Sequence, residues 1–148
     1  MSRRAVRRSD DGTATVEFVL VGLLLLVPLT YVALTALSVQ RTAFAAVEAA
    51  RSGARAFVTA PSGEAAAARA MQAVDLALAD QGVGSGAARL EIGCSARPCL
   101  TPGATVRVQV SATVRMPWLP AFLSGGIGGI PVQAVHVEVV DPFEPARS

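Results

Sequence analysis

Glu17 is the charged residue whose position most strongly suggests a chemical role. It stands at the start of an apolar run, and the next charged residue along the chain is Arg41. A charged side chain costs about 2.5–3.5 kcal/mol at the centre of a bilayer and less at the edge. We therefore expect Glu17 either to stay hydrated among the lipid headgroups or to bind a cation.

Cys94 and Cys99 are a second candidate pair, because they bracket a short turn that contains Pro98. If this part of the chain lies outside the cytoplasm, a disulfide is the favoured interpretation. Such a bond closes a short loop, so its stabilisation falls at the low end of about 0–5 kcal/mol. The rival is a metal site, but zinc needs about four ligands and His136 is the only histidine. We expect no metal and no other cofactor.

A catalytic site is hard to assemble from the remaining residues. Ser124, His136 and Asp141 are the residue types of a hydrolase triad, but Ser124 lacks the Gly-x-Ser-x-Gly setting of such a nucleophile. The glycine pairs at 125–126 and 128–129 lack the Lys-Ser/Thr ending of a phosphate-binding loop. We therefore expect neither an enzyme nor a small-molecule substrate.

The charge of the chain is concentrated at its N-terminus. The formal net charge is +2, and Arg3, Arg4, Arg7 and Arg8 supply the excess. No basic patch interleaved with aromatic residues occurs, so nucleic-acid binding is not indicated. An arginine excess beside an apolar span keeps that end in the cytoplasm, so residues 1–12 are expected to be a basic cytoplasmic leader and the rest to lie outside.

The apolar run predicts a membrane-spanning helix. As a helix, Phe18–Val39 would extend about 33 Å, enough for a bilayer core of roughly 30 Å. Pro28 is tolerated in a membrane helix, because neighbouring groups can satisfy the freed carbonyl. No Gly-Pro break follows, so the prediction is one helix over 13–58 whose outer part is amphipathic. The expected apolar stripe of that part contains Ala43, Val47, Ala50, Ala54, Phe57 and Val58.

Residues 59–148 are predicted to form a small extracytoplasmic α+β domain. Pro61-Ser62-Gly63 breaks the chain, with Ser62 as N-cap of a second helix from Glu64 to about Asp80. The residues expected on the core side of that helix are Ala67, Met71, Val74 and Leu78.

Three segments in the second half of the chain alternate apolar and polar residues, as half-buried strands do. They lie around Leu90–Ile92, over 105–116, and around Val135, Val137 and Val139. They predict an antiparallel three-stranded sheet with one apolar face, which the second helix and the outer part of the long helix would cover.

Two segments together resemble one family of proteins. Gly12-Thr13-Ala14-Thr15-Val16-Glu17-Phe18 follows the basic leader, and Ala49-Ala50-Arg51-Ser52-Gly53-Ala54-Arg55 follows the span. This arrangement resembles the TadE-like minor pilins, or pseudopilins, of tight-adherence (Tad, or Flp) type IV pilus systems. That family also carries a small strand-rich tail after the second segment.

The resemblance implies processing and assembly. A membrane prepilin peptidase would cut after Gly12, leaving Thr13 as the new N-terminus and Glu17 as the fifth mature residue. Glu17 would then pair with the terminal amine of a neighbouring subunit, with Phe18 completing the processing motif and Arg51 and Arg55 serving assembly. The implied partners are the membrane, other pilins, assembly-platform proteins and the peptidase.

Two alternatives remain open from the sequence. One is a secreted protein whose signal peptide is cut after Ala45. The other is an uncut single-span anchor that presents a ligand-binding domain, with Trp118 and Phe122 as contact residues. The N-terminal residue of the native protein distinguishes the three, because it would be Thr13, Ala46 or a residue near Met1.

Overall fold

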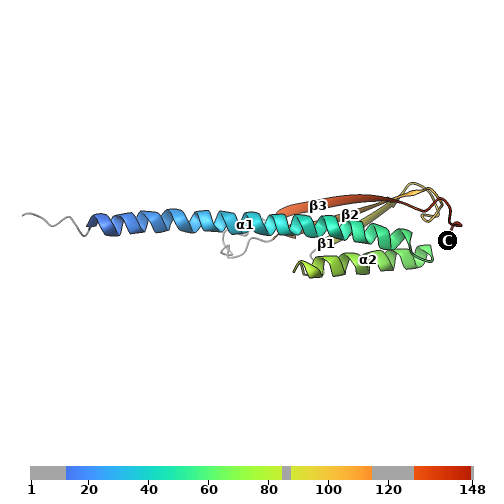
Figure 1. The fold of residues 1–148 in the computed structure, drawn as a ribbon, viewed down its shortest axis with the longest axis horizontal. Coiled ribbons are helices and arrows are strands. Elements are labelled where there is room, and N and C mark those ends of the chain that lie inside the picture. The colour runs from blue at the N-terminus through green and yellow to red at the C-terminus, as the bar shows by residue number, and fades with distance from the viewer. Residues whose placement is uncertain (1–12, 85–87, 115–128, 148) are drawn as a thin grey trace, which may run out of the picture. The chain divides into compact units, whose positions relative to one another are not determined.

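The computed structural model describes residues 13–84, 88–114 and 129–147. Its elements follow the order α1 (Thr13–Val58), α2 (Gly63–Asp80), β1 (Ala88–Cys94), β2 (Thr105–Val114) and β3 (Ile130–Val139) (Figure 1). The predicted fold class is confirmed: a long apolar N-terminal helix, a second helix and a three-stranded antiparallel sheet form a pilin-like α+β architecture. The chain divides into two compact units, Met1–Ala36 and Leu37–Ser148, and α1 contributes to both.

The first unit contains the apolar part of α1. Its large aliphatic side chains are exposed, and in the described part of the chain α1 is the one helix long and apolar enough to cross a membrane. Two of its threonine hydroxyl groups bond within the helix: the Thr30 Oγ1 donates to the Leu26 carbonyl at 2.8 Å, and the Thr35 Oγ1 donates to the Tyr31 carbonyl at 2.9 Å. Because these polar groups are satisfied locally, they do not oppose burial in lipid.

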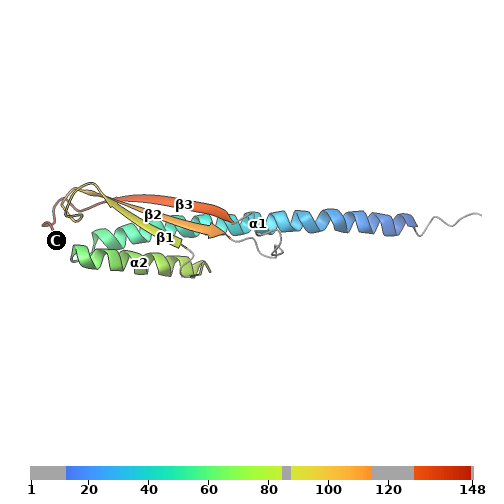
Figure 2. The ribbon, with the colours of Figure 1, turned by 180° about the vertical axis from the view of Figure 1, so that it is seen from behind.

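The second unit is built on the sheet, whose strand order is β1-β2-β3 with both neighbouring pairs antiparallel. β2 is the central strand, and its residues Val106, Val108 and Val110 are fully buried. α1 and α2 lie on the same side of the sheet (Figures 1 and 2). On β1 and β2 the opposite side carries the polar residues of the alternating pattern, as expected for an antiparallel sheet covered on one face.

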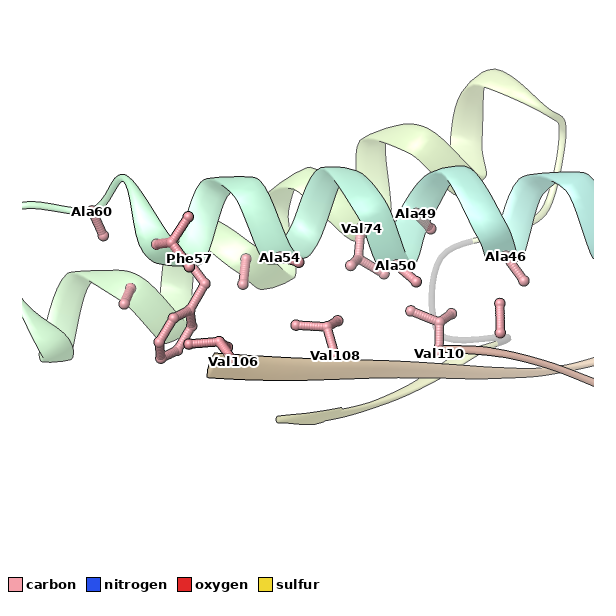
Figure 3. Close-up of a cluster of buried hydrophobic side chains, with 14 of the residues drawn as sticks. Ala46, Ala49, Ala50, Ala54, Phe57, Ala60, Val74, Val106, Val108 and Val110 are labelled. Atoms are coloured by element: carbon pink, nitrogen blue, oxygen red, sulfur yellow. The ribbon is translucent and has the colours of Figure 1, made fainter. Parts of the chain in front are cut away.

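The core lies between α1 and the sheet. Ala46, Ala50 and Ala54 point from successive turns of α1 toward Val110 and Val108, and Phe57 reaches Val106 near the end of the helix (Figure 3). The small alanine side chains allow the helix backbone to lie close to the valine surface. The core therefore depends on close approach of the backbones more than on large side chains.

The buried faces of both helices differ in part from those predicted: Ala50, Ala54, Phe57 and Val58 of α1 and Val74 and Leu78 of α2 are buried as expected, and other residues are not. On α2 the buried residues are Ala66, Ala70, Val74 and Leu78, whereas Ala67 and Met71 are exposed. On α1 Val47 is 57% exposed, while Ala45, Ala46 and Ala49 are completely buried. The reason is steric: alanine at the contact permits close helix packing, which the larger Met71 and Val47 would prevent.

β3 presents the opposite face to the helices from the one predicted. Val135, Val137 and Val139 lie on the outer face of the sheet and are 42–54% exposed. His136 and Glu138 lie on the helix-covered side, where their register partners are Val108 and Val106. β3 is an edge strand, so these polar side chains can extend past the rim of the core to water. A shift of one residue in register exchanges the two faces of a strand. The alternating pattern alone therefore did not determine which face of β3 points toward the helices.

The α2 N-terminus follows the sequence closely. Ser62 has the extended backbone of an N-cap, and its Oγ accepts a hydrogen bond from the Ala65 N–H at 3.3 Å. The predicted cleavage residue Gly12 and the loop residues Trp118, Phe122 and Ser124 lie outside the described residues.

Candidate assembly surface

Glu17 lies in the second turn of α1, on an otherwise apolar and exposed helix surface. Phe18 beside it is 79% exposed, and Leu20 and Val21, one helical turn further on, are 62% and 49% exposed. Glu17 forms no hydrogen bond or ion pair with any described residue, and α1 contains no basic residue before Arg41. Within the described chain, the carboxylate therefore has apolar neighbours and no cation to neutralise it.

The segment Ala49–Arg55 is the place where α1, α2 and β2 meet. Its residues Ala49, Ala50, Gly53 and Ala54 are all buried. A Cβ atom at Gly53 would lie 2.7 Å from the Val74 Cγ2, 3.5 Å from the Ala70 carbonyl oxygen and 3.6 Å from the Val108 Cγ1. Gly53 is thus required by the close approach of α2, and the four small residues form a packing surface for the protein's own core.

The two arginines of this segment point away from that packing surface. Arg51 and Arg55 are exposed, and neither forms an ion pair with another described residue. Ser52 lies between them and donates a hydrogen bond to the Glu48 Oε1 at 3.3 Å. The segment therefore has two sides: small residues hold the domain together, and both guanidinium groups remain available to other molecules.

The arginines belong to a larger exposed face of α1 that we call the outer α1 surface. At 100° per residue its members lie on one side of the helix. They are Leu37, Arg41, Phe44, Val47, Glu48, Arg51 and Arg55. Leu37, Phe44 and Val47 are 60%, 73% and 57% exposed, so the surface combines apolar side chains with an excess of positive charge.

Cys94 and Cys99 form a disulfide with a Cα–Cα distance of 5.4 Å. The bond closes the turn between β1 and Leu100, a residue that is fully buried. Ser95 fixes the same turn to the start of β2, because its N–H donates to the Thr105 carbonyl and its Oγ accepts from the Thr105 N–H at 2.9 Å. The disulfide stabilises one corner of the sheet and leaves the two helices unconstrained.

Arg147 is a structural residue that sequence reasoning missed. Its guanidinium group donates to the Val58 carbonyl at 2.9 Å and to the Ala60 carbonyl at 2.8 Å, and it forms an ion pair with Glu144 at 2.6 Å. Helix ends leave carbonyl groups without partners, so Arg147 caps the C-terminal end of α1. One isolated arginine many residues beyond the helix gives no sequence signal for such a contact.

Of the three residues considered for a hydrolase triad, His136 and Asp141 lie in the described part of the chain, and each has another partner there. His136 contacts Glu138 at 3.1 Å, and the Asp141 Oδ1 accepts a hydrogen bond from the Phe143 N–H. In the parts of the chain that the structure describes, no three His, Cys, Asp or Glu residues are placed to hold a metal ion.

A shallow depression of about 530 Å³ lies on the outer face of the sheet. Polar side chains line most of it, and several bond to one another: the Gln109 Nε2 donates to the Glu91 Oε2 and the Gln133 Nε2 donates to the Ser111 Oγ. A site for a small molecule is usually a deeper and more apolar cleft. This depression has the character of a solvated sheet face.

Comparison with protein families, curated proteins and solved structures gives no match for this chain.

Proposed function

We propose that this chain is a pilin-like structural subunit of the TadE-like type. In this proposal a prepilin peptidase cuts after Gly12, and the mature chain assembles with other pilins in a Tad/Flp-type pilus or a related secretion machinery. The protein has no enzymatic activity, no nucleic-acid partner and no small-molecule substrate. Its function is to insert in the membrane through α1 and to contact neighbouring subunits.

The observation that carries the proposal is the position of Glu17. Its carboxylate lies on an apolar helix and has no cation among the described residues, so burial between helices would leave it unpaired at a cost of several kcal/mol. The terminal amine of a neighbouring subunit that begins at Thr13 removes this cost, because the two charges neutralise each other. A cut after Gly12 creates that amine one helical turn, about 6 Å, before Glu17 along the helix.

The compartment of each part follows from the same elements. α1 is able to cross a membrane, and the Cys94–Cys99 disulfide indicates an oxidising environment for the second unit. Arginines before the span favour a cytoplasmic N-terminus. We infer a single-pass protein of the cytoplasmic membrane whose second unit is extracytoplasmic, with incorporation into a surface pilus after processing.

The packing of α1 favours this function over a secreted protein cut after Ala45. Ala45 and Ala46 are both completely buried in the core, and Thr42 before them is 8% exposed. A cut after Ala45 would remove part of the helix surface that covers the sheet. A pilin-like subunit keeps this surface intact and leaves Arg51 and Arg55 exposed for its neighbours.

The first test is the mass of the protein in its native membrane. Intact-mass measurement and N-terminal sequencing should give a chain that begins at Thr13, and Gly12→Leu should give a chain that keeps its leader. A native start at Ala46 would support secretion, and an uncut chain would support a simple membrane anchor. Either result contradicts the proposed processing.

The second test separates insertion from assembly. Glu17→Ala should leave membrane insertion unchanged and should reduce co-purification with other pilins by about tenfold or more, because loss of a buried charge pair costs at least 1.4 kcal/mol. Asp75→Ala is the matched control: it removes an exposed acid of α2, outside the span and away from the outer α1 surface. Equal co-purification of the two variants would show that Glu17 has no special part in assembly.

A further inference from the structure

The chain after β3 forms an ordered turn, which we call the distal turn and define as residues 140–147. Val140 continues the sheet, since its N–H donates to the Ala104 carbonyl at 2.8 Å and its carbonyl accepts from the Gly103 N–H at 3.0 Å. The Asp141 Oδ1 accepts a hydrogen bond from the Phe143 N–H at 2.9 Å. The other end is held by Arg147 on the C-terminal end of α1. Both ends of the turn are therefore fixed to the domain.

This turn presents the most exposed large apolar side chain in the described chain. Phe143 is 95% exposed, so its ring contributes almost nothing to the stability of the domain. The exposed carboxylate of Asp141 stands two residues before it and has no cation among the described residues, whereas Glu144 after it is already paired with Arg147. An aromatic residue held on a fixed turn loses little conformational entropy when it binds, which is typical of an anchor residue at a protein interface. Its surroundings call for a partner that is apolar and positively charged.

The outer α1 surface has that complementary character. Phe44 and Val47 are 73% and 57% exposed, and Arg41 and Arg51 lie one turn before and one turn after them. Neither arginine forms an ion pair with a described residue. An aromatic side chain near the unpaired carboxylate of Asp141 thus matches an apolar strip between arginines, and neither Phe143 nor Asp141 has a partner of this kind within the described part of one copy.

We propose that the distal turn of one copy binds the outer α1 surface of a second copy, with Phe143 against Phe44 and Val47. The two surfaces differ, so the contact is heterologous and can continue from copy to copy without closing. Arg147 holds the distal turn at Ala60, sixteen residues beyond Phe44, so adjacent copies would be displaced along the helix axis by roughly 24 Å. This contact lies in the second unit and does not depend on Glu17 or on cleavage after Gly12.

The test uses the full chain in dodecyl maltoside micelles. Phe143→benzoylphenylalanine places a photoreactive group in the proposed contact, and this chain is mixed with an isotope-labelled chain that lacks the probe. Irradiation should join position 143 to the labelled tryptic peptide Thr42–Arg51, which contains Phe44 and Val47. The matched control is Leu76→benzoylphenylalanine, at a 65% exposed position of α2, which should not label that peptide.

Two variants complete the test. Phe143→Ser should weaken self-association about 10- to 30-fold, as measured by sedimentation, because an anchor residue is lost. Its unfolding midpoint should remain that of the parent, which excludes misfolding. The crosslink from position 143 should persist when Glu17→Ala is also present. A failure of the proposed pilin assembly through Glu17 can therefore be distinguished from a failure of the contact made by the distal turn. A Phe143 crosslink to any other peptide, or unchanged self-association of Phe143→Ser, would overturn the proposal.

Discussion

Removal of the Arg147 side chain should destabilise the second unit more than any other change to a charged residue outside the core. Arg147 donates to the carbonyls of Val58 and Ala60 at the end of α1, and Ala60 is completely buried. In Arg147→Ala these carbonyls lose a charged donor in a place that water reaches poorly. The variant therefore tests whether the C-terminal turn closes the domain.

The magnitude follows from the two hydrogen bonds. A hydrogen bond to a charged group contributes about 1.5–3 kcal/mol, and the two bonds share one guanidinium group, so we expect Arg147→Ala to cost about 2–4 kcal/mol. Arg147→Lys keeps the charge but not the two-pronged geometry, and it should cost about 1–2 kcal/mol. The ion pair contributes less, because Glu144 is half-exposed; Glu144→Gln should stay within about 1 kcal/mol.

Urea unfolding of the full chain in detergent, followed by pulse proteolysis, measures these differences. With a slope of about 1–3 kcal/mol/M, a loss of 3 kcal/mol lowers the midpoint by roughly 1–3 M. Arg69→Ala on the exposed side of α2 is the control and should change the free energy of unfolding by less than about 0.5 kcal/mol. If Arg147→Ala matches this control, the capping role of Arg147 is wrong.

Three further changes test the packing by the same unfolding measurement. Gly53→Ala should lower the free energy of unfolding by about 1 kcal/mol, because overpacking against Val74 exceeds the gain in helix propensity. In a Val74→Ala background the clash is absent, so the same change should stabilise the protein by a similar amount. If the two substitutions act additively, Gly53 and Val74 are not in close contact. Val108→Ala should cost about 2 kcal/mol and Val137→Ala less than about 0.5 kcal/mol, and equal losses would contradict the observed faces of the sheet. Replacement of both cysteines by serine should cost about 1–2 kcal/mol and leave the unit folded; an unfolded variant would show that the disulfide holds more than its own turn.

Local patterns in the sequence were sufficient to predict the elements of the fold. The uninterrupted apolar and helical pattern indicated a helix over 13–58, and α1 is Thr13–Val58. The Pro61-Ser62-Gly63 break located the start of α2, with Ser62 as its N-cap. The alternation of valines indicated the strands. Each of these signals depends on residues that are close together in the chain.

The faces of those elements could not be predicted in the same way. Met71 on α2 and Val137 on β3 were expected in the core because they are apolar, yet they are 56% and 49% exposed. Their places are decided by the contact at Gly53, which only small residues permit, and by the pairing of β3 with β2. Arg147 was missed for a related reason, since it binds α1 across 89 and 87 residues. Long-range contacts of this kind leave no local pattern.

The central claim is that Glu17 of one subunit pairs with the terminal amine of another pilin. A membrane-permeant carbodiimide joins a carboxylate directly to an amine that contacts it, with loss of water and without a spacer. Applied to native membranes and followed by mass spectrometry, it should yield a peptide in which the Glu17 carboxyl is bonded to the N-terminal amine of a processed pilin, and Glu17→Gln should abolish that product. A Glu17 that is modified by the reagent but never linked to an amine would contradict the account.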